Sequence, residues 1–244
     1  MDSQQRVLVT GASSGIGRAT TQRLVEQGAK VVGVARRTEK ILATGALALR
    51  LDVTDSDACG QVVDTAAREL GGLDAVVNAA GLTRPGSVRH GNPADWAEMF
   101  AVNVTGLLAI CQAAIPYLVR SGHGQIINIS SMSGHRVLSP RNTVYAATKH
   151  AVEAISKGLR KELRDEGVRV TSVAPGYVRD TEIHHSPASP RPGFPAVSTQ
   201  ADRDAAAATG LGLAEFTDLI ISILQLPAGV QVQRLEVTSD LQAE

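Results

Sequence analysis

The chain has 244 residues, 43% of them hydrophobic, and it carries 24 Lys and Arg against 24 Asp and Glu. A formal net charge of zero argues against a basic nucleic-acid-binding surface, and the apolar fraction argues against a disordered chain. We therefore expect a folded protein with a single domain over residues 1–244 and no nucleic acid as a partner.

The apolar runs and the first residues bear on where such a protein would be found. Residues 1–6 are polar, so the chain starts without the pattern of a signal peptide. The longest apolar run, residues 102–119, contains Asn103, Gln112 and Pro116 and is shorter than the ~20 residues of a membrane span. We expect it to form a buried helix in a soluble, cytoplasmic protein without membrane contact.

Cysteines and histidines are few. Cys59 and Cys111 match no zinc or redox motif, and two cysteines do not make a disulfide framework, so we expect buried thiols. His184 and His185 are adjacent and lack a third ligand at a suitable spacing. No metal site is predicted.

Short apolar runs alternate with helical patterns along the chain. The apolar runs predict β-strands at residues 7–9, 30–35, 46–51, 73–78, 125–130, 169–174 and 234–238. Helical periodicity predicts helices at residues 15–27, 55–70, 95–120, 144–166 and 214–226, and the short link 37–46 leaves space for a turn or two. Strands that are apolar throughout indicate a parallel sheet covered on both faces. The predicted fold class is α/β, a single-domain Rossmann-like doubly wound parallel sheet of about seven strands.

One long segment departs from this rhythm. Residues 181–212 contain four prolines, Pro187, Pro190, Pro192 and Pro195, and have no hydrophobic periodicity. A loop of that length is uncommon unless it is a functional lid or disordered. We interpret it as a substrate lid.

A glycine-rich turn joins the first strand to the first helix. Backbone N–H groups and the positive end of the helix dipole attract an anion there, and glycines let the backbone approach a pyrophosphate. The turn predicts a dinucleotide site formed by Gly11, Ser13, Ser14, Gly15, Ile16 and Gly17.

The residues after the second strand bear on which dinucleotide binds. Enzymes that use NAD often carry a carboxylate there, whereas NADP needs a cation for its 2′-phosphate. This chain has Arg36 and Arg37 and no carboxylate, which favours NADP(H) over NAD(H); two solvated surface arginines are the alternative. Asp52 and Val53, after the third strand, are placed to meet the adenine edge.

Tyr145 and Lys149 lie four residues apart in a predicted helix and so share one face. An ammonium near a phenol lowers the phenol pKa from its ordinary value of about 10, which suits acid–base chemistry. Such a pair alone is more often a surface pair. Here Ser131 follows the fifth strand, and Asn103 is a polar amide in an apolar helix.

These motifs together resemble the short-chain dehydrogenase/reductases over residues 6 to about 180. The matching pieces, in the family's order, are residues 10–17, Asp52-Val53, Asn78-Ala79-Ala80-Gly81, Asn103, Ser131, Tyr145 with Lys149, and Pro175-Gly176. The resemblance implies further cofactor contacts from Asn78, Ala79, Ala80, Gly81, Pro175, Gly176 and Val178, in addition to Tyr145 and Lys149.

The resemblance also implies a catalytic role for four residues. Tyr145 would be the general acid in carbonyl reduction and the base in alcohol oxidation. Ser131 would hydrogen-bond the substrate oxygen. Lys149 would bind the nicotinamide ribose and lower the pKa of Tyr145, and Asn103 would hold a water that links Lys149 to solvent.

Two spacings depart from the family pattern. The loop from Ser131 to Tyr145 is one residue longer than usual, so Ser130 is an alternative to Ser131, which fits better. The family's Pro-Gly-x-Val-x-Thr also has one extra residue here, which leaves open whether Thr181 contacts the cofactor.

The residues and the resemblance predict an NADP(H)-dependent oxidoreductase that transfers a hydride between nicotinamide and a carbonyl or secondary alcohol, a ketone or aldehyde reductase. An NAD-dependent alcohol dehydrogenase and a non-catalytic dinucleotide-binding sensor or scaffold are the alternatives. The resemblance implies a homotetramer built on residues 95–120 and 144–166, with a homodimer second. The sequence leaves the small-molecule substrate and the reaction direction open.

Overall fold

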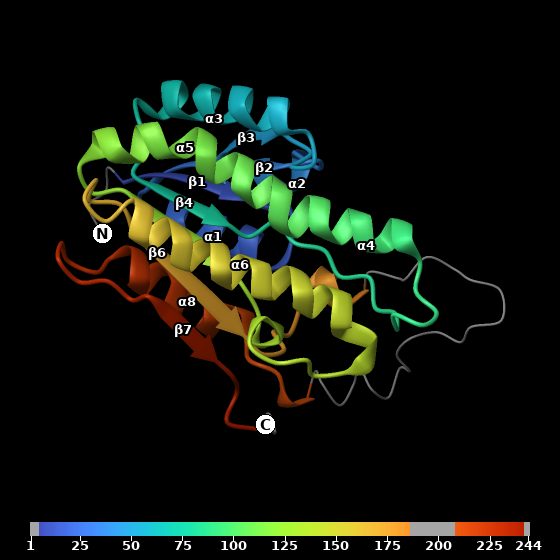
Figure 1. Cartoon of the computed structure of the whole chain (residues 1–244). Helices are drawn as coiled ribbons and strands as arrows, with labels where there is room; N and C mark the ends of the chain where they lie inside the picture. The colour runs from blue at the N-terminus through green and yellow to red at the C-terminus, as the bar shows by residue number, and fades with distance from the viewer. Residues whose placement is uncertain (1–4, 186–207, 242–244) are drawn as a thin grey trace.

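A seven-stranded parallel sheet forms the centre of the molecule (Figure 1). The computed structural model describes residues 5–185 and 208–241. The sheet has the order β3-β2-β1-β4-β5-β6-β7. Its strands are β1 (Arg6–Thr10), β2 (Lys30–Ala35), β3 (Leu47–Arg50), β4 (Ala75–Asn78), β5 (Gln125–Ile129), β6 (Arg169–Pro175) and β7 (Arg234–Val237). All seven predicted strands are present within about two residues of the expected positions, and the predicted fold class is confirmed.

Helices cover both faces of the sheet (Figure 1). One face is covered by α3 (Ser56–Leu70), α5 (Leu107–Ser121) and α6 (Thr143–Glu162), and the other by α1 (Gly15–Glu26), α2 (Glu39–Leu42) and α8 (Leu213–Leu224). The short α2 agrees with the turn or two expected there. Helix α6 ends four residues before the predicted end, and most of the predicted lid, residues 186–207, lies outside the described residues.

Two apolar clusters hold the helices on the sheet. On one face Leu8 and Ile126 of the sheet pack with Ile110 of α5, and on the other Val9 and Ile127 pack with Phe216 of α8. The thiols behave as predicted, because both cysteines are buried and unpaired. Burial raises the pKa of Cys59 to about 11 and that of Cys111 to about 12.

The predicted helix 95–120 is continuous but not uniformly α-helical. It consists of α4 (Pro93–Phe100), a π-helical turn η1 (Ala101–Gly106) and α5. The whole stretch Pro93–Ser121 is long and apolar enough to cross a membrane by length and hydropathy. Core helices pass the same test, and α5 packs five buried side chains, Leu107, Ile110, Cys111, Ala114 and Leu118, into the core against the sheet.

The strand order reverses between β1 and β4, which neighbour each other although β2 and β3 separate them in sequence. Loops leave such a point in opposite directions, and open α/β sheets bind ligands in the crevice outside the carboxyl ends of the strands there. Thr10 and Asn78 are paired at these ends. The topology therefore places a crevice beside the glycine-rich turn.

An ion pair fixes the opposite, amino ends of the same two strands. The carboxylate of Asp74, just before β4, accepts hydrogen bonds from the backbone N, Nε and Nη2 of Arg6 at 2.8, 2.9 and 2.6 Å. Burial alone would raise the pKa of Asp74, but the hydrogen bonds and charge of Arg6 outweigh it and hold that pKa below its ordinary value. Asp74 thus ties β4 to β1.

We expect Asp74→Asn to lower the free energy of unfolding by about 1–3 kcal/mol at neutral pH, because a buried charged hydrogen bond is lost. A depressed carboxyl pKa stabilises the fold above the unfolded-state value near 3.8 and ceases to do so as pH falls through the folded-state value. Urea unfolding at several pH values should show the variant and the wild type converging in acid. The exposed Asp165→Asn is the control, and an equal loss in both variants would contradict the assignment.

Candidate active site

The glycine-rich turn after β1 lies in close contact with the loop after β4. Gly11 has φ +66°, and a Cβ there would lie 2.8 Å from the Ala79 carbonyl and from the Ala80 backbone. A Cβ at Gly17 would overlap the Gly11 carbonyl. Only glycine therefore permits this packing of turn, helix and neighbouring loop.

The hydroxyl of Thr10 joins these two loops. Its Oγ1 accepts hydrogen bonds from the N–H groups of Ala79 and Ala80, each at 3.1 Å. The next residue, Gly81, is exposed, and a Cβ on it would lie 3.9 Å from the Nζ of Lys149. The structure thus brings the glycine-rich turn, the Ala79–Ala80–Gly81 loop and Lys149 to one place.

The first turn of α1 suits an anion. Ser14, the residue before the helix, makes no side-chain capping hydrogen bond, and no acidic residue lies in the first turn. The N–H groups that a helix leaves without partners at its start are then available to a ligand phosphate, which the helix dipole also favours. Ser13, Ile16 and the glycines of this turn fit a dinucleotide pyrophosphate.

Asp52 and Val53 follow β3 as predicted. The Oδ1 of Asp52 accepts hydrogen bonds from the backbone N and the hydroxyl of Thr54, which lower the pKa of Asp52, and the charge of Arg36 lowers it further. Val53 packs its backbone against Gly106, where a Cβ would lie 2.6 Å from the Val53 carbonyl. This contact joins the loop after β3 to the π-helical turn.

Of the two arginines after β2, Arg37 has a partner that sequence reasoning missed. Its Nη2 lies 2.6 Å from Oε2 of Glu182, and the Nζ of Lys40 in α2 lies 3.0 Å from the other oxygen of the same carboxylate. Glu182 is 145 residues away in sequence, so no local pattern indicates the pairing.

Ser131 and Tyr145 meet at the carboxyl end of β5. Ser131 is extended and begins the short helix η2 (Met132–Gly134), where its Oγ accepts from the N–H of Ser133. It also lies close enough to Tyr145 to lower the pKa of that phenol. Ser130 is buried, with its hydroxyl beneath Gly134. The geometry therefore favours Ser131 over Ser130 as the serine of the site.

The predicted lowering of the Tyr145 pKa by Lys149 is wrong for this arrangement. Burial raises the pKa of Tyr145 to about 12, and only the hydrogen bond with Ser131 opposes that rise. The Nζ of Lys149 instead donates to the Ile129 carbonyl at 2.8 Å and lies 5.8 Å from the Tyr145 ring centroid. Burial also lowers the pKa of Lys149 to about 8, against the charge of Glu153. Desolvation is the dominant effect at both groups.

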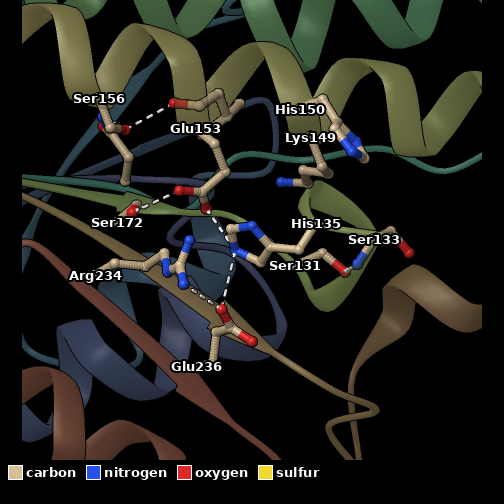
Figure 2. Close-up of polar contacts among 12 residues, drawn as sticks. Ser131, Ser133, His135, Lys149, His150, Glu153, Ser156, Ser172, Arg234 and Glu236 are labelled. Atoms are coloured by element: carbon tan, nitrogen blue, oxygen red, sulfur yellow. Dashed lines mark hydrogen bonds and ion pairs between the residues drawn. The ribbon is translucent and has the colours of Figure 1, made fainter. Parts of the chain in front are cut away.

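Glu153 belongs to a partly buried polar cluster next to Lys149 (Figure 2). It lies one turn after Lys149 on α6 and accepts a hydrogen bond from the Ser172 hydroxyl at 2.8 Å. The Nε2 of His135 lies 3.5 Å from Glu153 and 3.7 Å from Glu236 of β7. The cluster thus connects η2, α6 and β7. In the sequence, only the four-residue spacing between Lys149 and Glu153 could have indicated that these two side chains lie close together.

Asn103 lies in the π-helical turn, a feature that often marks functional sites. Its amide nitrogen donates to the Leu82 carbonyl at 2.8 Å and to the Thr148 hydroxyl at 3.1 Å, and its oxygen accepts from the Leu82 N–H at 2.8 Å. Both amide hydrogens are used within the protein. Asn103 therefore holds the loop after β4 against α6, one residue before Lys149.

Asn78 lies below the crevice. Its Nδ2 donates to Oδ1 of Asn128 at 2.9 Å and to the sulfur of Cys111, and Asn128 in turn donates to Ser156. The side chain therefore links β4, β5, α5 and α6. Its position supports the loop that carries Ala79, Ala80 and Gly81.

The extra residue before Thr181 is absorbed in a left-handed turn. Asp180 has φ 60°, the only positive φ of a non-glycine residue in the described part of the chain. Thr181 is buried, donates to the Val178 carbonyl at 3.0 Å, and would lie 3.4 Å from a Cβ at Gly15. It therefore borders the glycine-rich turn despite the altered spacing.

The segment before Thr181 is anchored at both ends. The Gly176 N–H, after Pro175, donates to the Val237 carbonyl of β7 at 2.8 Å. Val178 is buried and forms a bridge with Leu211. These contacts place Pro175, Gly176 and Val178 at the carboxyl end of β6, on the same edge of the sheet as Ser131.

The chain is similar in sequence to known proteins over most of its length. A family model described as short chain dehydrogenase matches residues 5–191. An uncharacterized oxidoreductase of Staphylococcus aureus strain USA300 is 40% identical over 183 residues, 72% of this chain and 78% of the relative.

Solved structures extend the likeness to nearly the whole chain. The closed form of a serine dehydrogenase complexed with NADP+ has a TM-score of 0.85 and 30% identity, covering 98% of this chain and 96% of that one. An alcohol dehydrogenase from the archaeon Thermococcus sibiricus complexed with 5-hydroxy-NADP has a TM-score of 0.84 and 25% identity, covering 98% of both chains.

Replacing Asn103 tests its bridging contacts. Asn103→Ala leaves both backbone groups of Leu82 and the Thr148 hydroxyl without this partner, so we expect the free energy of unfolding to fall by about 1–3 kcal/mol. Thermal or urea unfolding measures it. Gln112→Ala, which removes an exposed amide from α5, should change stability little. Equal stability of the two variants would show that the Asn103 contacts do not support the fold.

Proposed function

The chain belongs to the short chain dehydrogenase family, and on this premise we propose that it is an NADP(H)-dependent oxidoreductase. The proposed reaction transfers a hydride between the nicotinamide and a carbonyl or secondary alcohol, with a small-molecule ketone or aldehyde as the substrate in the reducing direction. The observation that carries the proposal is the meeting of Ser131, Tyr145 and Lys149 beside the glycine-rich turn and Gly81.

Tyr145 is the proton donor in this proposal. A phenol whose pKa is raised to about 12 is protonated at neutral pH, which is the form needed to protonate the oxygen of a reduced carbonyl. Ser131, which lies next to Tyr145, can donate to the same substrate oxygen and stabilise its developing negative charge. The nicotinamide, when bound, supplies the hydride.

Lys149 supplies positive charge to the site. Its ammonium is next to Gly81 and one side of the Tyr145 ring, where it can bind a ribose hydroxyl and stabilise the phenolate left after proton transfer. Asn103 positions the helix that carries Lys149, through Thr148. In this proposal Asn103 also holds a water that links Lys149 to solvent.

NADP(H) is the proposed cofactor because β2 is followed by Arg36 and Arg37, and Lys40 adds a third cation. Two of the similar solved proteins are complexed with NADP+ or 5-hydroxy-NADP. One observation favours the NAD-dependent alternative, since Glu182 pairs with two of the three cations. Binding of the two nucleotides distinguishes the alternatives.

We also propose assembly into a cytoplasmic homotetramer through α4, α5 and α6. Phe100 and Leu108 are large apolar side chains that remain 41% exposed on the first two of these helices, which is consistent with a subunit interface. A dimer would need less of this surface. Sedimentation of the purified protein distinguishes them.

Tyr145→Phe should lower the rate of carbonyl reduction by about 10²- to 10⁴-fold, the usual contribution of a general acid. Oxidation of NADPH over a panel of aldehydes and ketones measures it, and NADP+ binding should be unchanged. Tyr117→Phe, which loses a surface hydroxyl that donates to Asp64, is the matched control. A Tyr145→Phe enzyme that keeps most of its rate would rule out this acid.

Glu153→Gln should move the alkaline limb of the pH–rate profile to lower pH. Lys149 is charged below its pKa, and the Glu153 carboxylate raises that pKa, so its removal lets Lys149 lose its proton earlier as pH rises. The kcat profile across pH 6–10 measures the shift. Glu162→Gln, an exposed change on the same helix, should leave the profile in place. Identical profiles for both variants would exclude the coupling.

A further inference from the structure

Glu182 joins three segments at the edge of the proposed dinucleotide site. It is the first residue of η4 (Glu182–His185). One carboxylate oxygen lies 2.6 Å from Nη2 of Arg37, in the loop after β2, and the other lies 3.0 Å from Nζ of Lys40 in α2. The carboxylate therefore bridges a guanidinium and an ammonium, one on each oxygen.

A guanidinium and an ammonium converging on two oxygens are also what a phosphomonoester binds. In this fold the adenosine ribose of a bound dinucleotide lies at the loop after β2, so the 2′-phosphate of NADP(H) would bind to cations there. The hydrogen bonds from Arg37 and then Lys40 hold the pKa of Glu182 below its ordinary value, so the carboxylate is ionised at neutral pH. Glu182 thus offers the same two donors a competing anion.

We propose that Glu182 is a specificity-determining residue whose carboxylate competes with the 2′-phosphate of NADP(H) for Arg37 and Lys40. It thereby reduces the preference for NADP(H) over NAD(H) that the cations alone would give. This inference rests on the proposed function, because it assumes that the 2′-phosphate binds at Arg37.

The competition is one that the phosphate can win. The side chains of Arg37, Lys40 and Glu182 are 45%, 37% and 51% exposed, and ion pairs this open to solvent contribute little. A phosphate carries more negative charge and more acceptor oxygens than a carboxylate. Glu182 therefore weakens binding of the phosphorylated nucleotide without preventing it.

The neighbours of Glu182 place it in contact with the rest of the site. Thr181, one residue before, lies against Gly15 of the glycine-rich turn, and Ile183, one residue after, lies next to Gly81. Glu182 is therefore flanked by residues that border the glycine-rich turn and the Lys149 region. Release of Glu182 by a 2′-phosphate would act on a segment that is packed at both neighbours.

Calorimetric titration with 2′,5′-ADP and 5′-AMP tests the inference without catalysis. Glu182→Gln keeps the side-chain shape and removes the charge, so 2′,5′-ADP should bind about 3- to 10-fold more tightly and 5′-AMP equally well. NADP+ and NAD+ should show the same difference. Glu182→Ala should change binding in the same direction, and it also removes any hydrogen bond that the glutamine could keep with Arg37.

Two further variants separate the possible outcomes. Glu39→Gln removes an exposed carboxylate next to Lys40 and should change 2′,5′-ADP binding less than twofold if contact rather than general charge matters. Arg37→Ala should weaken 2′,5′-ADP at least about tenfold.

The inference is overturned if Arg37→Ala weakens 2′,5′-ADP while both Glu182 variants leave it unchanged or weaken it. If Arg37→Ala has no effect, or if neither the wild type nor Glu182→Gln binds 2′,5′-ADP better than 5′-AMP, the proposed NADP(H) preference fails as well.

Discussion

The close approach of two loops at the carboxyl edge of β1 and β4 is the contact on which the site depends. It requires Gly11, since any side chain there would overlap the backbone after β4. It is held by the Thr10 hydroxyl, which takes the N–H groups of Ala79 and Ala80. Because this contact positions Gly81, it also positions the glycine-rich turn relative to Lys149. The strand order creates the crevice, and Thr10 and Gly11 hold the two loops at its edge together.

Desolvation rather than pairing governs the acid–base groups. Tyr145 and Lys149 lie close enough to interact, yet burial moves the pKa of each toward the neutral form. The phenol therefore stays protonated at neutral pH, and the amine becomes easier to neutralise. Glu153 and its neighbours, the partly buried His135 and the exposed Glu236, then matter, because Glu153 is the carboxylate that opposes the loss of charge on Lys149. The protonation state of Lys149 therefore depends on the charge of Glu153.

The sequence predicted the sheet, the helices on its faces and the family from apolar periodicity and motif spacing, because those features are local. It did not predict the π-helical turn around Asn103, nor the hydrogen bonds that the Asn103 side chain makes to Leu82 and Thr148 in other segments. The left-handed Asp180 likewise absorbs an extra residue that spacing alone made ambiguous. The direction of the Tyr145 pKa was missed because i,i+4 spacing gives proximity but not burial, nor the direction in which Lys149 donates.

The arginines after β2 show why the number of cations in a sequence is an incomplete guide to cofactor preference. Arg36 and Arg37 are equivalent by sequence, and both suggest a phosphate. In the fold Arg36 lies near Asp52, whereas Arg37 pairs with Glu182, which is 145 residues away in sequence. Selectivity between two nucleotides is a difference of affinities, and an anion that already pairs with a cation reduces that difference, although less than loss of the cation would. An acid that pairs with an arginine at such a site therefore has to be considered together with the arginine when a cofactor preference is predicted.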